Sequence, residues 1–137
     1  MIKRRQLLQI SAGLMASQSL GLRAETTESA LPLIQRPIPS SGELLPVMGM
    51  GTSRTFDTPD DEASLTALHA VLQPFFSAGG TVIDSSPMYG NAEARVGDVL
   101  RSMQEPPKLF AATKVWTNGR EQGIAQMEES ARRMNVA

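Results

Sequence analysis

Hydrophobic and polar positions change their spacing several times along the chain. The first long stretch with helical spacing follows Asp60 or Asp61, either of which can cap a helix that runs through Ala78. Pro74 should kink this helix, because proline removes a backbone donor. The predicted buried face consists of Leu65, Leu68, Leu72, Phe75 and Phe76.

Two further helices and three strands follow from the same pattern. Helices are predicted over Ala92–Met103 and in the segment from Ile124 to Met134. Their apolar faces are Val96, Val99, Leu100 and Met103 in one helix, and Ile124, Met127, Ala131 and Met134 in the other. Short apolar runs that precede the helices predict strands: Val47–Gly51, Thr81–Asp84 and Lys108–Lys114. Before them, Arg36–Pro46 predicts a small hairpin that turns at Ser41-Gly42.

The order of these elements sets the fold class. The predicted strand ends, Gly51, Asp84 and Lys114, lie about 30 residues apart, which is the size of a βαβ unit. Strands that alternate with helices imply an α/β fold with a parallel sheet, either an open doubly wound sheet or a barrel. A closed (β/α)8 TIM barrel needs eight units and about 250 residues. We therefore expect about three βα units with a leading hairpin, the N-terminal portion of a larger fold.

Residues 1–24 differ from the rest of the chain. Lys3, Arg4 and Arg5 precede a modest apolar stretch from Leu7 to Leu22, which is the pattern of a bacterial export signal peptide. Polar residues interrupt this stretch, so no stable membrane span is expected. The segment "KRRQLLQ" resembles a twin-arginine signal, although a general secretory signal or an amphipathic helix remain alternatives. We expect a periplasmic protein that interacts with the export machinery through this segment. After it we expect a polar linker over 25–36 and a barrel domain over 37–137.

Composition excludes several kinds of site. The sequence has no cysteine and one histidine, His69, which excludes disulfides, thiolate metal sites and histidine clusters. The formal net charge of −1 gives no electrostatic reason to expect nucleic acid as a partner.

Candidate chemistry gathers where two strands end. Reactive groups in parallel α/β folds lie at the C-terminal ends of strands. Neighbouring strands are about 5 Å apart, so Asp84 and Lys114 can reach each other, and Tyr89 in the loop after Asp84 can fold over both. An ammonium beside a phenol favours the phenolate and lowers the phenol pKa. The expected result is a tuned general acid that protonates an oxygen.

Three segments carry a family resemblance. "GELLPVMGMGTSRTFD", "GGTVIDSSPMYGNAEARVGDVL" and "LFAATKVW", in this order, resemble the N-terminal third of an aldo/keto reductase. The resemblance implies a barrel closed at its base by a hairpin and an NADP(H) cofactor bound without a Rossmann domain. It also implies reduction of a small-molecule carbonyl, an aldehyde or a ketone, with a tyrosine that protonates the oxygen.

The resemblance also implies roles for individual residues. By position, Asp84, Tyr89 and Lys114 match three of the four catalytic residues of the family, with Tyr89 as the acid. His69 lies on the first predicted helix and does not match the fourth, a histidine. Substrate identity is not predicted, because the specificity loops of the family lie near its C-terminus.

Further matches concern the cofactor and the substrate. Gly51, Thr52 and Ser53 match the loop beside the nicotinamide ribose, with Arg54 as a weaker candidate. Asp84 borders the same cofactor site, and Trp116 matches an aromatic residue of the substrate pocket.

The sequence alone leaves other functions open. The chain could be a regulatory relative that binds NADP(H) without turnover, a degenerate truncated product, or an aldolase with Lys114 as its Schiff-base lysine. We expect the 137-residue chain by itself to be marginally stable and inactive. An exported reductase would fold around NADP(H) before transport.

Overall fold

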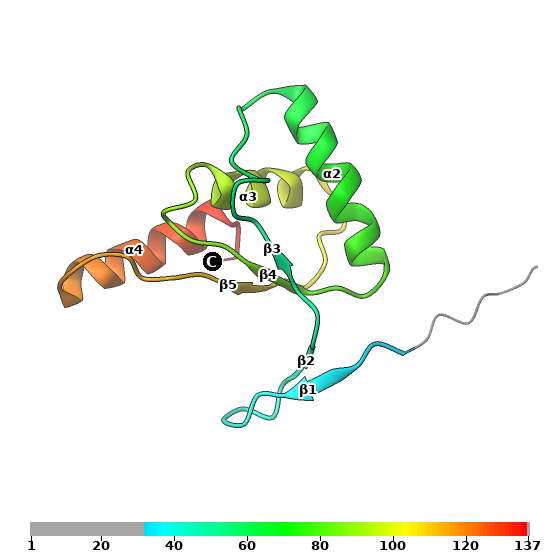
Figure 1. Ribbon diagram of the computed structural model, residues 1–137, viewed down its shortest axis with the longest axis horizontal. Helices are drawn as coiled ribbons and strands as arrows, with labels where there is room; N and C mark the ends of the chain where they lie inside the picture. Colours follow the sequence, from blue (N-terminus) through cyan, green and yellow to red (C-terminus); the bar gives the residue numbers. More distant parts are fainter. Residues whose placement is uncertain (1–31, 137) are drawn as a thin grey trace, which may run out of the picture. The chain divides into compact units, whose positions relative to one another are not determined.

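A computed structural model describes residues 32–136, so the expected signal peptide and most of the expected linker lie outside the described residues. The elements occur in the order β1 (Gln35–Pro37), β2 (Leu44–Pro46), β3 (Met50–Gly51), α2 (Glu62–Ser77), β4 (Val82–Asp84), α3 (Ala92–Ser102), β5 (Phe110–Ala112) and α4 (Arg120–Arg133). Figure 1 shows the hairpin β1–β2 and, beyond it, strands β3 to β5 with the three helices.

The predicted hairpin is present. β1 and β2 pair antiparallel, with Arg36 opposite Leu45. Gly42 has a φ of 73°, a left-handed conformation that glycine adopts without strain. The ammonium of Lys108, which precedes β5, lies 3.2 Å from a carboxylate oxygen of Glu43, between the two strands. The hairpin therefore lies beside the N-terminal end of the main sheet.

The main sheet is parallel, as the alternation of elements predicted. Its strand order is β3-β4-β5, with Ile83 of β4 opposite Met50 on one side and Ala111 on the other. The outer strands are shorter than predicted from sequence, because β3 pairs with β4 only at Met50 and Gly51, and β5 only from Phe110 to Ala112. Lys114 consequently lies two residues beyond the end of β5 rather than within it.

Helix α2 forms where the apolar spacing placed it. The carboxylate of Asp61 caps the helix by accepting a hydrogen bond from the backbone N–H of Ser64 at 2.7 Å. All five residues of the predicted face belong to the core or pack against it: Leu65, Leu68, Leu72, Phe75 and Phe76. Pro74 lies within the helix, which continues to Ser77.

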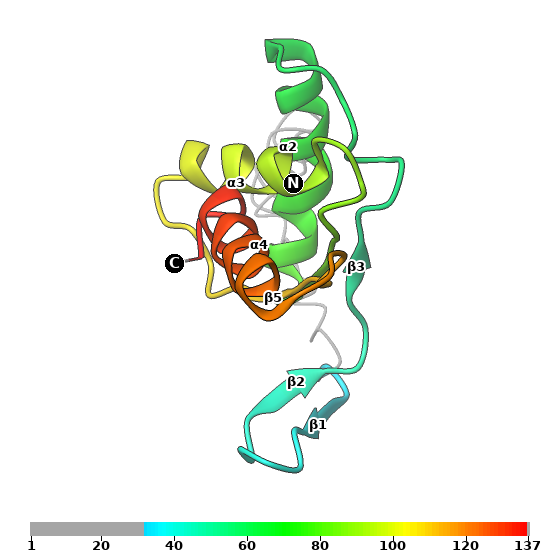
Figure 2. The ribbon, with the colours of Figure 1, turned by 90° about the vertical axis from the view of Figure 1, so that its left-hand side faces the viewer.

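Helix α3 packs into the middle of the core. Val96, Val99 and Leu100 are buried together with Ile83 of β4 and Leu72 of α2. Figure 2 shows the helices on one side of the strands, and Ile83 is the β4 residue that this side buries completely. The other side of β4 carries Asp84, which is exposed.

Helix α4 corrects one prediction. Ile124 and Met127, expected on its buried face, are 40% and 47% exposed, whereas Met134, also expected there, is buried. Gly123 and Ser130, which were not expected there, are buried as well. The small residues allow a close approach: a Cβ on Gly97 of α3 would overlap the carbonyl oxygen of Arg133. The close approach of α4 to α3 therefore depends on the absence of a side chain at Gly97, and of the large apolar residues expected on the buried face only Met134 joins the core.

No helix within residues 32–136 combines the length and apolar character needed to cross a membrane.

Candidate functional site

The parallel register brings Asp84 and Lys114 together at the C-terminal edge of the sheet. The Lys114 ammonium donates to both carboxylate oxygens of Asp84, at 2.8 and 3.0 Å, and to the carbonyl oxygen of Ser85 at 2.8 Å. Asp84 ends β4, and the Lys114 side chain reaches back to it from beyond β5. The ammonium is thus fixed by three acceptors from one neighbouring segment.

Tyr89 completes this cluster. Its ring lies under the Lys114 ammonium, with Nζ 5.0 Å from the ring centroid, within the range of a cation–π interaction. The hydrogen bond to Asp84, with a smaller share from Tyr89, holds the pKa of Lys114 above its ordinary value, against the opposing effect of partial burial. The structure therefore brings the three predicted catalytic residues together and keeps the lysine charged. Their catalytic roles stay predictions.

The hydroxyls of Thr52 and Ser85 form hydrogen bonds beside the backbone of Asp84. Thr52 is fully buried, and its hydroxyl lies 3.0 Å from the carbonyl oxygen of Asp84 and 2.9 Å from the hydroxyl of Ser85. Its backbone N–H also donates to the Asp84 carbonyl oxygen, at 3.1 Å. Thr52, matched to the cofactor loop, is therefore already engaged within the protein. Ser85 stands in the family-like segment "GGTVIDSSPMYGNAEARVGDVL", but the sequence alone gave it no role of its own.

The other residues of the matched loop are accessible. Gly51 and Ser53 are exposed, and a Cβ on Gly51 would meet no atom within 4 Å. Gly51 pairs with Asp84 in the sheet, so this open space adjoins the cluster. Arg54 is exposed and has a φ of 66°, which is uncommon for a residue other than glycine. Gly51, Ser53 and Arg54 are thus accessible beside Asp84, and their assignment to a cofactor site stays a prediction.

Trp116 is anchored through its backbone rather than its ring. Its N–H donates to the side-chain oxygen of Gln126 on α4, and its carbonyl oxygen accepts from the amide nitrogen of the same side chain. The indole ring is largely exposed, so it is available to a ligand. Its assignment to a substrate pocket stays a prediction.

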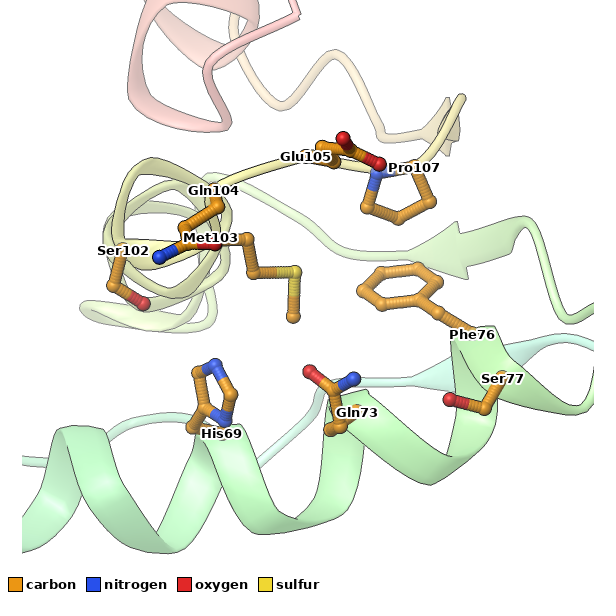
Figure 3. Close-up of a pocket in the computed structure, with 9 residues that line it drawn as sticks. All are labelled: His69, Gln73, Phe76, Ser77, Ser102, Met103, Gln104, Glu105 and Pro107. Carbon is orange, nitrogen blue, oxygen red and sulfur yellow. The ribbon is translucent and has the colours of Figure 1, made fainter.

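His69 lies away from the cluster, as expected. It lines a cavity of about 560 Å³ between α2 and the segment that follows α3. Figure 3 shows its ring pointing from α2 toward Ser102 and Met103. None of the candidate catalytic residues lines this cavity.

A buried carboxylate was not foreseen. Glu93 is 1% exposed and accepts a hydrogen bond from the hydroxyl of Thr113 at 2.8 Å. The signal was present in the sequence, because Glu93 shares a helix face with Val96 and Leu100, at spacings of three and seven residues.

Within residues 32–136 no group of three or more acidic or histidine side chains is arranged to hold a metal ion.

Comparisons with known proteins agree on one family. The sequence profile described as "Aldo/keto reductase family" matches residues 47–137. Methylglyoxal reductase YeaE of Escherichia coli (strain K12) is 35% identical, over 74% of this chain and 36% of its own length. The chain thus spans about a third of the length of this curated relative.

Solved structures give the fold. An aldo-keto reductase from Klebsiella pneumoniae in complex with NADPH has a TM-score of 0.58 at 24% identity, over 76% of this chain and 37% of its own. An aldo/keto reductase from the same organism in complex with NADP and acetate has a TM-score of 0.54 at 27% identity, over 69% and 33%. The described residues therefore have the α/β fold of part of a (β/α)8 barrel.

Proposed function

Because the chain belongs to the aldo/keto reductase family, we propose that it serves the NADPH-dependent reduction of an aldehyde or ketone to an alcohol. The observation that carries this proposal is the Lys114 ammonium, bound by Asp84 and lying over the ring of Tyr89. A phenol beside a fixed cation is suited to give a proton to an oxygen that gains negative charge.

In the proposed reaction Tyr89 is the general acid. When bound, NADPH would supply the hydride that reduces the carbonyl carbon. The Tyr89 hydroxyl gives its proton to the carbonyl oxygen, which leaves a phenolate on the protein and an alcohol as product. The Lys114 ammonium stabilises that phenolate by its charge. Asp84 orients the ammonium through two hydrogen bonds, so little reorganisation accompanies proton transfer.

The residues that would hold the nicotinamide end of the cofactor are Gly51, Ser53 and Asp84. The open space at Gly51 and the exposed position of Ser53 support this assignment. Thr52 would act indirectly, since its hydroxyl holds the backbone beneath Asp84. Trp116 would contribute its exposed ring to the substrate side.

The raised pKa of Lys114 disfavours an aldolase. A Schiff-base lysine needs a neutral amine and therefore a lowered pKa. The hydrogen bond from Lys114 to Asp84 has the opposite effect and keeps the side chain protonated. A regulatory role, with cofactor binding and little turnover, is the alternative that the test below separates.

The test uses a chimera, because the chain spans about a third of its curated relative. Residues 47–137 replace the matching segment of the E. coli methylglyoxal reductase, and NADPH oxidation is followed by absorbance with methylglyoxal as the substrate. We expect turnover that Tyr89→Phe lowers by about 10²- to 10⁴-fold, the usual contribution of a general acid. Met88→Leu, at the exposed neighbouring position, is the matched control and should keep full activity.

Two results would count against this function. NADPH binding without turnover in a folded chimera would favour the regulatory role. Full activity of the Tyr89→Phe variant would show that another group supplies the proton.

We further propose that residues 1–24 direct export to the periplasm by the twin-arginine route, and that the protein folds around NADP(H) before transport. The support is the Arg4-Arg5 pair ahead of a modest apolar stretch. The test fuses residues 1–36 to a reporter that is active only after export. Replacing both arginines with lysine should abolish export by this route, whereas unchanged export would indicate the general secretory route.

A further inference from the structure

The peptide group between Gly90 and Asn91, in the turn that carries Tyr89, is held at both of its polar atoms. The carbonyl oxygen of Gly90 accepts a hydrogen bond from the Arg133 guanidinium at 3.0 Å. The N–H of Asn91, in the same peptide group, donates to the carboxylate of Asp57 at 2.9 Å. Gly90 has a φ of 59°, and a Cβ there would overlap the Asp57 carboxylate. The turn that carries Tyr89 is thus fixed by residues from the loop after β3 and from the end of α4.

Arg133 also connects this turn to a buried carboxylate. Its second guanidinium nitrogen lies 3.6 Å from Glu93, which is in the first turn of α3. The amino end of a helix favours a negative charge, which suits Glu93 to this position. Burial strengthens the attraction between the two groups, because little water screens them.

The same carboxylate reaches the segment that carries the lysine. Glu93 accepts a hydrogen bond from Thr113 at 2.8 Å, and Thr113 directly precedes Lys114. One connected set of contacts therefore runs from the Tyr89 turn through Arg133, Glu93 and Thr113 to the lysine. None of these three side chains is among the acceptors or the ring that contact the Lys114 ammonium.

We propose that Glu93 and Arg133 are positioning residues that fix the phenol of Tyr89 relative to the Lys114 ammonium. This inference rests on the proposed function, in which the two groups act together. The pair does not touch the reacting atoms and acts through Gly90 on one side and Thr113 on the other.

A purely structural role would give a different result. Glu93 and Arg133 also join α3 to α4, so their loss could lower stability without moving Tyr89 from Lys114. The test must therefore report the relative position of the two side chains while the protein is folded.

Nuclear magnetic resonance of the full 137-residue chain provides that report. Protons over an aromatic ring are shifted upfield, and the chain has a single tyrosine. The shift of the Lys114 ε-methylene protons is measured against those of Lys108, whose side chain is 88% exposed. The variants are Glu93→Gln, Arg133→Gln and Thr113→Val, with circular dichroism as the check of folding. Arg132→Gln is the matched control, because the neighbouring Arg132 pairs only with Glu129 of its own helix among the described residues.

We expect the upfield shift in the wild-type chain and in the Arg132→Gln variant, and its loss in Glu93→Gln and Arg133→Gln. If Glu93→Gln fails to fold, Thr113→Val takes its place, since it removes one hydrogen bond at nearly constant volume. The upfield shift should be lost in this variant too. An unchanged shift in the folded variants would overturn the proposal. Because this signal does not depend on turnover, active Tyr89→Phe chimeras would refute the proposed function and leave the positioning result standing.

Discussion

Lys114 shows how one side chain can be held in a single protonation state. Its ammonium makes two hydrogen bonds to Asp84 and lies over the Tyr89 ring, and these contacts raise its pKa. A raised pKa means that the folded protein binds this proton more tightly than the unfolded chain does. The pair therefore stabilises the fold while lysine is charged in both states, and this contribution disappears as the pH rises through the raised pKa.

We predict that Lys114→Gln lowers the free energy of unfolding by about 1 kcal/mol or less at neutral pH, since the pair is 39% and 51% exposed and solvent weakens it. The difference should persist up to the ordinary lysine pKa of about 10.4 and fade above it. Urea unfolding of both proteins over this pH range provides the measurement.

The control for this experiment is Lys108→Gln. Lys108 makes a longer contact, 3.2 Å, with a side chain that is 88% exposed, so its replacement should change stability less. An equal loss for Lys114→Gln at neutral pH and at high pH would show that the charge of Lys114 does not carry the effect.

Among the elements, α3 and α4 approach each other over a glycine. Gly97 is buried, and a Cβ there would overlap the backbone of Arg133, which a helix cannot easily move. We predict that Gly97→Ala lowers the free energy of unfolding by about 1–3 kcal/mol, the range for an overpacked interior. Chemical denaturation measures this change.

Gly51→Ala is the matched control in β3. A Cβ at Gly51 meets no atom within 4 Å, so the same substitution should have little effect on stability. Similar losses in the two variants would contradict the close packing of α3 on α4.

Apolar spacing predicted the helices better than their contacts. In α2 and α3 the large apolar residues form the core, as Leu72 and Val96 do, so their spacing identified the buried face. In α4 the buried residues include Gly123 and Ser130, which carry little hydrophobic signal, whereas the larger Met127 is exposed. Spacing cannot show which face a neighbour covers when small residues make the contact.

In the fold of the described residues, the two ends of the sheet have different tasks. The hairpin lies by the N-terminal ends of the strands, where Glu43 meets Lys108, whereas Asp84 and Lys114 meet at the C-terminal ends. This separation could be predicted, because parallel strands place all their carboxyl ends on one edge. The sequence could therefore predict those contacts of the site that depend on strand order, such as the pairing of Asp84 with Lys114.

The supporting contacts could not be predicted in the same way. Asp57, Glu93 and Arg133 are charged, and charged residues are mostly on the surface. The roles of Glu93 and Arg133 depend on where the end of α4 lies against α3, and that of Asp57 on how the loop after β3 folds toward Asn91. Both are matters of packing and not of strand order. The sequence pattern thus predicted the cluster but not the contacts that fix its geometry.

In the proposed mechanism Tyr89 and Lys114 act as one proton-donating unit. A double-mutant cycle in the chimera tests it most directly, with kcat measured for Tyr89→Phe, Lys114→Met and the double variant. Residues that act as a unit give strongly non-additive losses. We predict that the double variant is no slower than the slower single variant, whereas losses that multiply would show that the two groups act independently.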